Sequence, residues 1–177
     1  MKEVISFILR SRLSPVSWLD IARETSISSP NTARAYVETL ELLLAAKILN
    51  LISPDGTVLY RKNKKIHLID PFLYTVLSHY TRLKVYPEVV AESIVASHLL
   101  RIADIYYWRN KMEVDVVALI GGKQVGFEVK TGVKKPKIPP HLRSRYILLD
   151  SETLPLTLAS MNVTPTLYES PAIGRLY

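Results

Sequence analysis

Cysteine is absent from the 177 residues, so the chain forms neither disulfides nor a cysteine-ligated zinc site. No apolar run approaches the length that a membrane span needs. The charged residues Glu3, Arg10 and Arg12 bracket the first apolar stretch, and no small-residue cleavage site follows it, which does not fit a secretory signal. These absences exclude a disulfide-rich secreted protein and a membrane-spanning protein, and we expect a cytoplasmic one.

Acidic residues are fewer than basic ones, 16 against 23, which gives the chain a net charge of +7. A basic protein favours an acidic partner, and nucleic acid is the commonest such partner. A chain of 177 residues is long enough for one large core or two modest ones. Composition therefore indicates one or two compact domains that bind nucleic acid.

The first seventy residues show three helical segments and then two short strands. Ser17 with Asp20 resembles a capping box at the second helix, and Ser29-Pro30 is a strong start for the third. The expected helices cover 3–12, 18–22 and 30–46, and the expected strands cover 48–52 and 57–61. This order describes a winged helix-turn-helix, which we predict over residues 1–70.

A winged helix that binds DNA places the N-terminal part of its third helix in the major groove. The residues expected on the exposed side of that helix are Asn31, Thr32, Arg34 and Tyr36. The basic residues of the wing and its exit are Arg61, Lys62, Lys64 and Lys65, and such a run can follow phosphates. Winged helices also serve as protein-interaction or spacer modules, and basic runs are often only solvated, so both interpretations stay open.

A β-hairpin is predicted further along, from two strand-like runs, 114–120 and 123–129, that flank a pair of glycines. A two-residue turn at these glycines places Asp115 opposite Glu128. Directly opposed residues are about 4.5–5.5 Å apart at Cβ, and like charges there are destabilising. A divalent cation is the obvious compensation, because Mg²⁺ binds through one or two carboxylates and substrate phosphate.

The register also sets which charged side chains share a face of the sheet. Glu128 and Lys130 are two residues apart on one strand, so both project from the side that carries Asp115. Two carboxylates and an ammonium on one face suit metal-dependent hydrolysis of a phosphodiester. The alternative is a solvated strand face on which Glu113, opposite Lys130, forms a cross-strand ion pair.

Asp115, twelve intervening residues and then Glu128-Val129-Lys130 resemble the D…ExK signature of the PD-(D/E)xK nuclease superfamily. The resemblance implies an α/β (α+β) fold in which a restriction-endonuclease-like αβββαβ domain with a mixed sheet follows the winged helix, over residues 71–177. It also implies that Asp115, Glu128 and the backbone carbonyl of Val129 bind Mg²⁺ or Mn²⁺. Lys130 is then expected to position the attacking water.

The superfamily often has a further acidic ligand on the helix before the sheet. Residues 87–100 read as that helix, because Pro87 suits a first helical position and apolar residues follow at helical spacing. Glu92 falls among those apolar residues, and a carboxylate there needs a partner or a metal. Glu92 is therefore the third expected metal ligand, and the alternative is that it reaches solvent from the rim of the apolar face.

The segments after the hairpin are less informative. Residues 132–140 form a basic, proline-rich loop in which Lys134 and Lys135 are candidates for phosphate contact, although a plain surface crossover is the alternative. A buried strand is expected over residues 145–150. The tail after residue 154 is expected to add a helix or strand at the sheet edge.

The order of winged helix and nuclease-like domain resembles the C-terminal half of a family of archaeal and bacterial P-loop ATPases. The segment 65–71, the helix with Glu92 and the run Tyr107-Trp108-Arg109 before Glu113 carry this resemblance. The chain has no GxxxxGK[ST] motif, so it lacks the phosphate-binding loop of those ATPases and cannot hydrolyse ATP by itself. The resemblance implies a P-loop ATPase as a partner.

We therefore expect a DNA-binding protein with an Mg²⁺-dependent endonuclease site, which acts as a monomer or a homodimer. The alternative is a catalytically inert DNA- or protein-binding module that partners a P-loop ATPase. A third class, a small-ligand transcription regulator, fits the winged helix but leaves the opposition of Asp115 and Glu128 unexplained.

Overall fold

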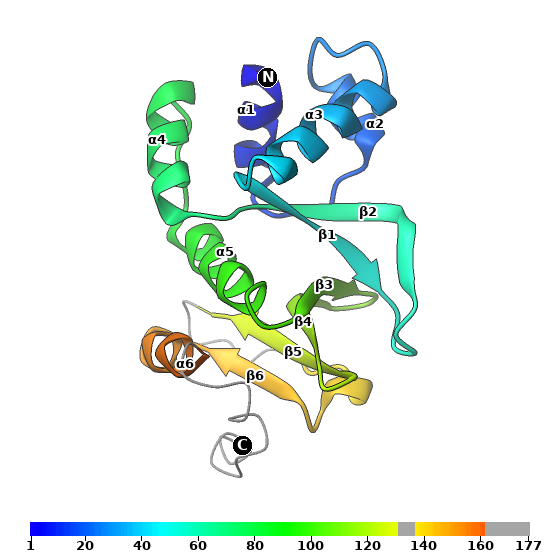
Figure 1. Ribbon diagram of the computed structural model, residues 1–177, viewed down its shortest axis with the longest axis vertical. Coiled ribbons are helices and arrows are strands. Elements are labelled where there is room, and N and C mark those ends of the chain that lie inside the picture. The colour runs from blue at the N-terminus through cyan, green and yellow to red at the C-terminus, as the bar shows by residue number, and fades with distance from the viewer. Residues whose placement is uncertain (131–136, 162–177) are drawn as a thin grey trace.

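The computed structural model describes residues 1–130 and 137–161 (Figure 1). The helices of this part are α1 (Lys2–Ser11), α2 (Trp18–Arg23), α3 (Pro30–Leu42), α4 (Pro71–Thr81), α5 (Pro87–Leu99), the short 3-10 helix η1 (Pro140–Leu142) and α6 (Thr153–Met161). The strands are β1 (Ala46–Ile52), β2 (Val58–Leu68), β3 (Asp104–Arg109), β4 (Glu113–Ile120), β5 (Lys123–Val129) and β6 (Tyr146–Leu149). This content confirms the expected α/β (α+β) class. No helix among the described residues is long and apolar enough to cross a membrane.

The six strands of the described part form one mixed sheet in the order β2-β1-β3-β4-β5-β6. The pairs β1–β3 and β5–β6 are parallel, and the other neighbours are antiparallel. The β1–β2 hairpin is continuous with the C-terminal strands through the pairing of Leu51 with Tyr107. Figure 1 shows α1, α2 and α3 gathered on one side of β1 and β2, with α5 running between that group and the remaining strands.

The starts of the N-terminal helices follow their capping residues. Ser17 and Asp20 form a complete capping box at α2, in which each side chain bonds the backbone N–H of the other. Ser29 caps α3 ahead of Pro30, and Asp70 accepts a hydrogen bond from the N–H of Phe72 at the start of α4. Such capping residues mark helix starts in a sequence because each satisfies N–H groups that the first turn of a helix leaves unpaired.

The third helix ends at Leu42, earlier than the expected end near Ala46. Leu44 adopts the left-handed conformation, with φ of 55°. The N–H of Leu44 donates to the carbonyl of Glu41, and that of Ala45 donates to Leu40. This is a Schellman closure, which ends a helix even without glycine when the following segment is held elsewhere. Here the next segment is β1, whose pairing with β2 begins at Ala46.

The strand expected over 57–61 is the first part of a longer strand, β2, which continues to Leu68. Its pairing with β1 is interrupted between Asn50 and Leu51, which oppose Lys64 and Leu59. Four residues of β2 therefore bulge out, and the strand re-enters the sheet at Lys64. Bulges of this kind re-aim side chains, and this one sets the direction of Lys65.

Buried apolar side chains form three clusters in the described residues. The first lies among α1–α4 and the start of α5, and it includes Tyr74, beyond residue 70. The second contains Val116 and Ala118 with residues of α5, and the third contains Val117 with Leu142 of η1. Side chains alternate along a strand, so the second and third clusters lie on opposite faces of β4. The division into domains over 1–70 and 71–177 stays a prediction.

Candidate functional site

The hairpin of β4 and β5 has the predicted turn and register. The pairs run from Val116 with Phe127 to Ile120 with Lys123. Gly121 and Gly122 both have positive φ, 56° and 73°. A two-residue turn of this kind needs positive φ at both central positions, which glycine adopts without strain. The turn therefore sets this register, whose last recorded pair, Val116 with Phe127, lies next to Asp115 and Glu128.

Asp115 and Glu128 lie together at the open end of this hairpin. Oδ2 of Asp115 accepts a hydrogen bond of 3.0 Å from the backbone N–H of Val129, the residue after Glu128. Burial raises the pKa of the Glu128 carboxyl, and the negative charge of Asp115 raises it further. The pairing of β3 with β4 shifts between Tyr106 and Trp108, beside Asp115. The two expected carboxylates thus share a site in which their charges repel.

Lys130 lies on the same side of the strand as Glu128, as expected from their spacing. Its Nζ is 2.5 Å from Oε1 of Glu128, and 36% of the Lys130 side chain is exposed. Burial disfavours the charged amine, but the hydrogen bond and charge of Glu128 outweigh it and raise the pKa of Lys130. Lys130 is therefore an ammonium at neutral pH, and it still reaches solvent.

The alternative pairing of Glu113 with Lys130 is wrong. Oε1 of Glu113 lies 2.7 Å from Nζ of Lys65, and its Oε2 lies 3.6 Å from Nε of Arg109. The carboxylate of Glu113 turns towards β2 and β3 because two cations are available there, whereas Lys130 is held by Glu128.

Lys65 is buried, which contradicts its expected role as a phosphate contact on the wing. It opposes Leu49 in the β1–β2 pairing and is 1% exposed. Its Nζ lies 2.8 Å from Oε1 of Glu92, 2.7 Å from Glu113 and 3.5 Å from Oδ1 of Asp115. Burial works against its charge, but these carboxylates raise the pKa of Lys65 above its ordinary value. We call Lys65, Glu92, Glu113 and Asp115 the Lys65 cluster.

Glu92 does not reach solvent from the rim of α5, which was the alternative to the ligand role. Its side chain is 13% exposed and bonds Lys65. Burial raises the pKa of Glu92 to about 7; Lys65 opposes this shift, whereas Asp115 and Glu113 add to it. The buried carboxylate thus has the partner that its position on an apolar helix face requires, but that partner is an ammonium.

A buried polar chain continues from the Lys65 cluster towards α4, and the sequence reading missed it. Nε2 of His67 is 3.8 Å from Oε1 of Glu92, and its Nδ1 is 3.1 Å from Oγ of Ser93. Ser93 also bonds the hydroxyl of Tyr74 at 2.7 Å. Burial, with the charge of Lys65, lowers the pKa of His67 well below its ordinary value, so the ring is neutral. Lys65 and His67 are two apart on a strand, and this spacing was the signal that they share a face.

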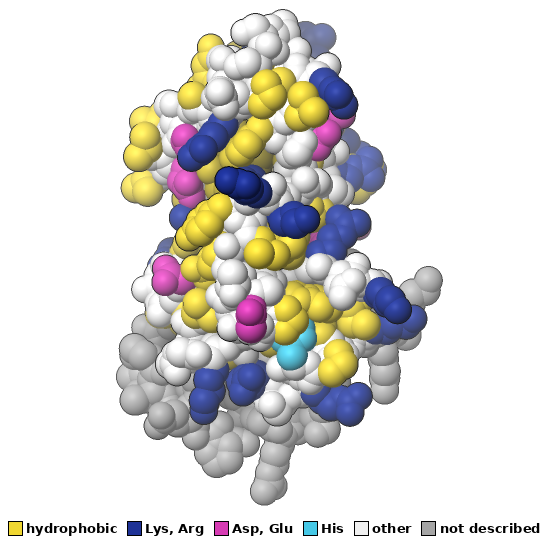
Figure 2. Space-filling view, turned by 90° about the vertical axis from the view of Figure 1, so that its right-hand side faces the viewer, with side chains coloured by type: hydrophobic (Ala, Val, Ile, Leu, Met, Phe, Trp, Pro, Cys, Tyr) yellow, Lys and Arg dark blue, Asp and Glu magenta, His cyan; other side chains and the backbone are white. Residues whose placement is uncertain are grey.

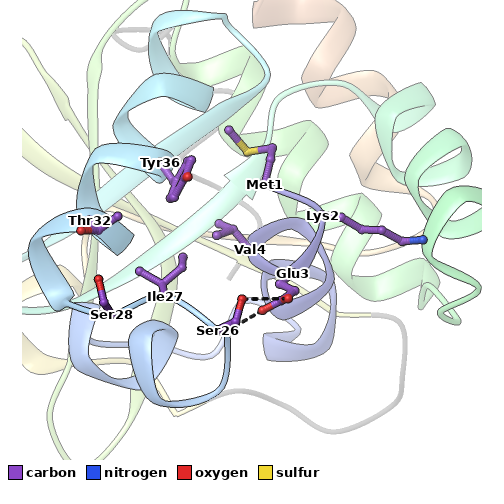
Figure 3. Close-up of a pocket in the computed structure, with 9 residues that line it drawn as sticks. All are labelled: Met1, Lys2, Glu3, Val4, Ser26, Ile27, Ser28, Thr32 and Tyr36. Atoms are coloured by element: carbon purple, nitrogen blue, oxygen red, sulfur yellow. Dashed lines mark hydrogen bonds between the residues drawn. The ribbon is translucent and has the colours of Figure 1, made fainter.

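The expected recognition surface is exposed. The residues on it are Asn31, Thr32, Arg34 and Tyr36. Nε of Arg34 lies 2.7 Å from Oε1 of Glu38 one turn along the helix, so its charge is partly offset. Thr32 and Tyr36 also border an open hollow of about 400 Å³ between α1, α3 and the loop before α3 (Figure 3). In this hollow both carboxylate oxygens of Glu3 accept hydrogen bonds from Ser26.

The basic residues of the expected wing, which belong to β2 of the β1–β2 hairpin, have different environments. Arg61 and Lys62 are exposed. Lys64, in contrast, is 6% exposed, and its Nζ donates to the carbonyls of Tyr60 and Lys62. Burial lowers its pKa, and the bulge of β2 folds it inward, so its expected contact with phosphates is wrong for this conformation.

Lys134 and Lys135 lie outside the described residues. Figure 2 shows further Lys and Arg side chains spread over the face that carries the wing.

The described residues contain no group of three or more His, Asp or Glu side chains placed to hold a metal ion together. Two carboxylates, those of Asp115 and Glu128, meet at the hairpin end. A pair of this kind suits Mg²⁺, which usually binds one or two carboxylates and completes its shell with water and phosphate. Burial and, after it, the charge of Asp115 raise the pKa of Glu128, and a cation held by both carboxylates would offset both effects.

Residues 84–164 match a protein family described as a domain of unknown function (DUF4143), which is an ATPase-associated domain. The matched range covers less than half of the chain and contains Glu92, Asp115, Glu128 and Lys130. It does not contain Lys65 or His67, which complete the buried cluster from β2. No curated protein and no solved structure matches the chain.

Proposed function

We propose that the chain binds DNA and hydrolyses its phosphodiester bonds at the open end of the β4–β5 hairpin, with Mg²⁺ or Mn²⁺. The observation that carries this proposal is the pairing of Asp115 with Glu128, next to a solvent-reaching Lys130. Asp115 contacts Lys65 and the N–H of Val129, and Glu128 contacts Lys130, yet the charge of Asp115 still disfavours the ionised form of Glu128. A divalent cation bound there polarises a phosphoryl oxygen and lowers the pKa of a bound water.

Asp115 and Glu128 are the residues that would hold the cation, with the carbonyl of Val129 beside them. Oδ2 of Asp115 is oriented by the N–H of Val129, so the carboxylate is held in place before any ligand arrives. Glu92, the third expected ligand, is bonded to Lys65 through Oε1. We therefore assign Glu92 to the support of Asp115, through the ammonium that both contact.

Lys130 supplies the positive charge on the solvent side of the pair. A cation on Glu128 competes with Lys130 for the same carboxylate, and the flexible lysine stem lets the ammonium turn towards a water or phosphate. There it positions the attacking water and offsets the negative charge that develops in the transition state. Its raised pKa keeps this charge in place at neutral pH.

The DNA contacts are assigned to exposed residues on the N-terminal half. The helix residues are Asn31, Thr32, Arg34 and Tyr36, and the wing residues are Arg61 and Lys62. Lys134 and Lys135 are further candidates by sequence. Two copies of the chain acting as a homodimer would cut both strands of a duplex, and a P-loop ATPase is the proposed partner, in line with the ATPase-associated family match.

Cleavage of plasmid and branched DNA with Mg²⁺ or Mn²⁺ tests this function. The variants are Asp115→Asn and Lys130→Ala, and the matched control is Lys123→Ala at the far end of β5, where the lysine is exposed. We expect cutting by the wild type and the control, and none by the two site variants. Equal cutting by Lys130→Ala and the wild type would assign the activity elsewhere.

A second candidate function is that of an inert DNA- or protein-binding module which partners a P-loop ATPase. The Lys65 cluster favours it, because three of the four carboxylates near the site already contact one buried ammonium. DNA binding without cleavage by any variant, with or without a metal, supports this reading. Binding that appears only when the partner ATPase is added would place the chain as a recruitment module.

A further inference from the structure

Lys65 joins the two halves of the chain at the carboxylate site. It is carried by β2, the second strand of the wing, whereas its partners come from α5 and β4. We propose that Lys65 is a positioning residue which acts as a built-in cation, orders Glu92 and Asp115, and restrains the affinity of the site for divalent cations. The proposal deepens the proposed function, and it rests on a divalent cation binding at Asp115 and Glu128.

The geometry of the ammonium supports a role beyond packing. Its three close carboxylates come from two different elements, at 2.7, 2.8 and 3.5 Å. A lysine added only to neutralise one buried acid needs a single partner. Here the side chain crosses from the β1–β2 hairpin to the helix and the hairpin that carry the site, so the placement of Asp115 depends on the wing.

Asp115 links the ammonium of Lys65 to the expected cation site at Glu128. Its Oδ1 faces Lys65, whereas its Oδ2 is held by the β5 backbone beside Glu128. A cation on Asp115 therefore has a fixed positive charge within a few ångströms, and like charges at such range repel strongly where water is scarce. Replacing Lys65 with a neutral residue removes this repulsion and strengthens cation binding. If Lys65 only supports the fold, the same replacement should weaken cation binding, because a loosened site binds a cation less tightly.

Among the described residues, the ion pairs of Glu92, Glu113 and Asp115 include no second buried ammonium. The nearest basic side chain on the same face of β2 is His67, which is buried and neutral. Among the described residues its Nε2 has no hydrogen-bond partner, and it lies 3.8 Å from Oε1 of Glu92. Arg109 contacts only the outer oxygen of Glu113 among the described residues. Lys65 is thus the buried, fixed positive charge at Asp115, whereas Lys130, on whose pKa Asp115 also acts, reaches solvent.

Mn²⁺ affinity of the full chain, measured by calorimetric titration without DNA at pH 8, tests the proposal. We compare the wild type with Lys65→Met, Lys65→Arg and the exposed control Lys123→Met. We expect Lys65→Met to bind Mn²⁺ about tenfold more tightly than the wild type. Lys65→Arg keeps the charge and should stay within about twofold of the wild type. Unchanged or weaker binding by Lys65→Met overturns the proposal.

A second comparison keeps the test decisive if Lys65→Met does not fold. Glu92→Gln and the double variant Lys65→Met with Glu92→Gln differ only in the ammonium of Lys65. Relative to the wild type, the double variant buries one positive and one negative charge fewer. We expect the double variant to bind Mn²⁺ more tightly than Glu92→Gln, and equal or weaker binding overturns the proposal.

The same proteins separate this proposal from the proposed function. If Lys65→Met binds Mn²⁺ tightly and the wild type neither binds it nor cuts DNA, Lys65 restrains the cation and the nuclease function fails. If the wild type cuts DNA with Mn²⁺ and Lys65→Met shows no gain in affinity, the nuclease function stands and the role of Lys65 is wrong.

Discussion

The two lysines of the site, Lys65 and Lys130, differ in what surrounds the same functional group. Lys65 is almost fully buried and contacts three carboxylates, whereas Lys130 is about one third exposed and contacts Glu128. In both, carboxylates raise the pKa of the amine against the effect of burial. The comparison teaches that charge state alone does not separate a structural lysine from a reactive one.

Access to solvent and freedom to move distinguish a reactive lysine from a structural one. Lys65 cannot turn away without leaving buried carboxylates unpaired, which is costly. Lys130 contacts one carboxylate among the described residues, that of Glu128, and 36% of its side chain is exposed, so its ammonium can turn to a water or phosphate when a metal cation replaces it on Glu128. The four predictions that follow either strengthen or remove this contrast.

Lys65→Met should have the largest effect on stability. We expect it to lower the free energy of unfolding by about 3–5 kcal/mol, because it leaves buried carboxylates without their cation. Urea unfolding at pH 8 measures this change, and Lys123→Met is the control. A loss below about 1 kcal/mol would mean that water reaches the Lys65 cluster, and the contrast with Lys130 would disappear.

Lys130→Ala should reduce cleavage and destabilise the chain less than Lys65→Met does. We expect a loss of activity of at least about 100-fold, the lower range for the loss of one group that stabilises transition-state charge. The Glu128 side chain is 6% exposed and loses its ammonium, so we expect a cost of about 1–3 kcal/mol. Initial cleavage rates and urea midpoints on the same preparations measure both quantities. A loss of stability as large as that of Lys65→Met would make Lys130 another structural lysine.

Glu92→Gln should change the dependence of stability on pH. Burial raises the pKa of Glu92 to about 7 from an unfolded value of 4.5, although Lys65 opposes the shift. Between those pH values the folded chain binds more protons than the unfolded chain, so the contribution of Glu92 to stability falls as pH rises. The variant should flatten that fall, whereas Glu88→Gln, on the exposed side of α5, should not. Unfolding measured from pH 5 to pH 8 decides this, and an unchanged slope would contradict the prediction.

Glu113→Gln should have the smallest effect of the four. Its side chain is 30% exposed, and Glu92 and Asp115 remain on Lys65 when it is neutralised. We expect a cost below about 1 kcal/mol, in the range of exposed pairs. Thermal or urea unfolding measures it. A cost as large as that of Lys65→Met would show that Glu113 is the main partner of the ammonium.

Features set by neighbours in the chain were predictable. The hairpin register follows from two glycines and alternation, and it brought Asp115 to Glu128 and Lys130 beside Glu128. Helix starts followed their serine and aspartate caps. The end of α3 was misplaced because no glycine marks it; the entry of Ala46 into the sheet decides it instead.

The basic run of β2 shows why the environments of its lysines were not predictable. Lys62 is exposed, Lys64 folds back on backbone carbonyls, and Lys65 turns into the protein. All three are lysines in one short run, and the shift of the β1–β2 register between Asn50 and Leu51 gives them different environments. A shift of that kind depends on the partner strand, so a local pattern cannot reveal it.

The sequence by itself determined the elements and the pairing at the hairpin end, because capping, alternation and a two-residue turn act over a few neighbouring residues. The tertiary structure decided which lysine serves which carboxylate. It brought Lys65 of β2 against Glu92 of α5 and Asp115 of β4, which are far apart in the chain. Burial decides which lysine pairs with which carboxylate, since a charge removed from water needs a partner of opposite charge nearby in the fold.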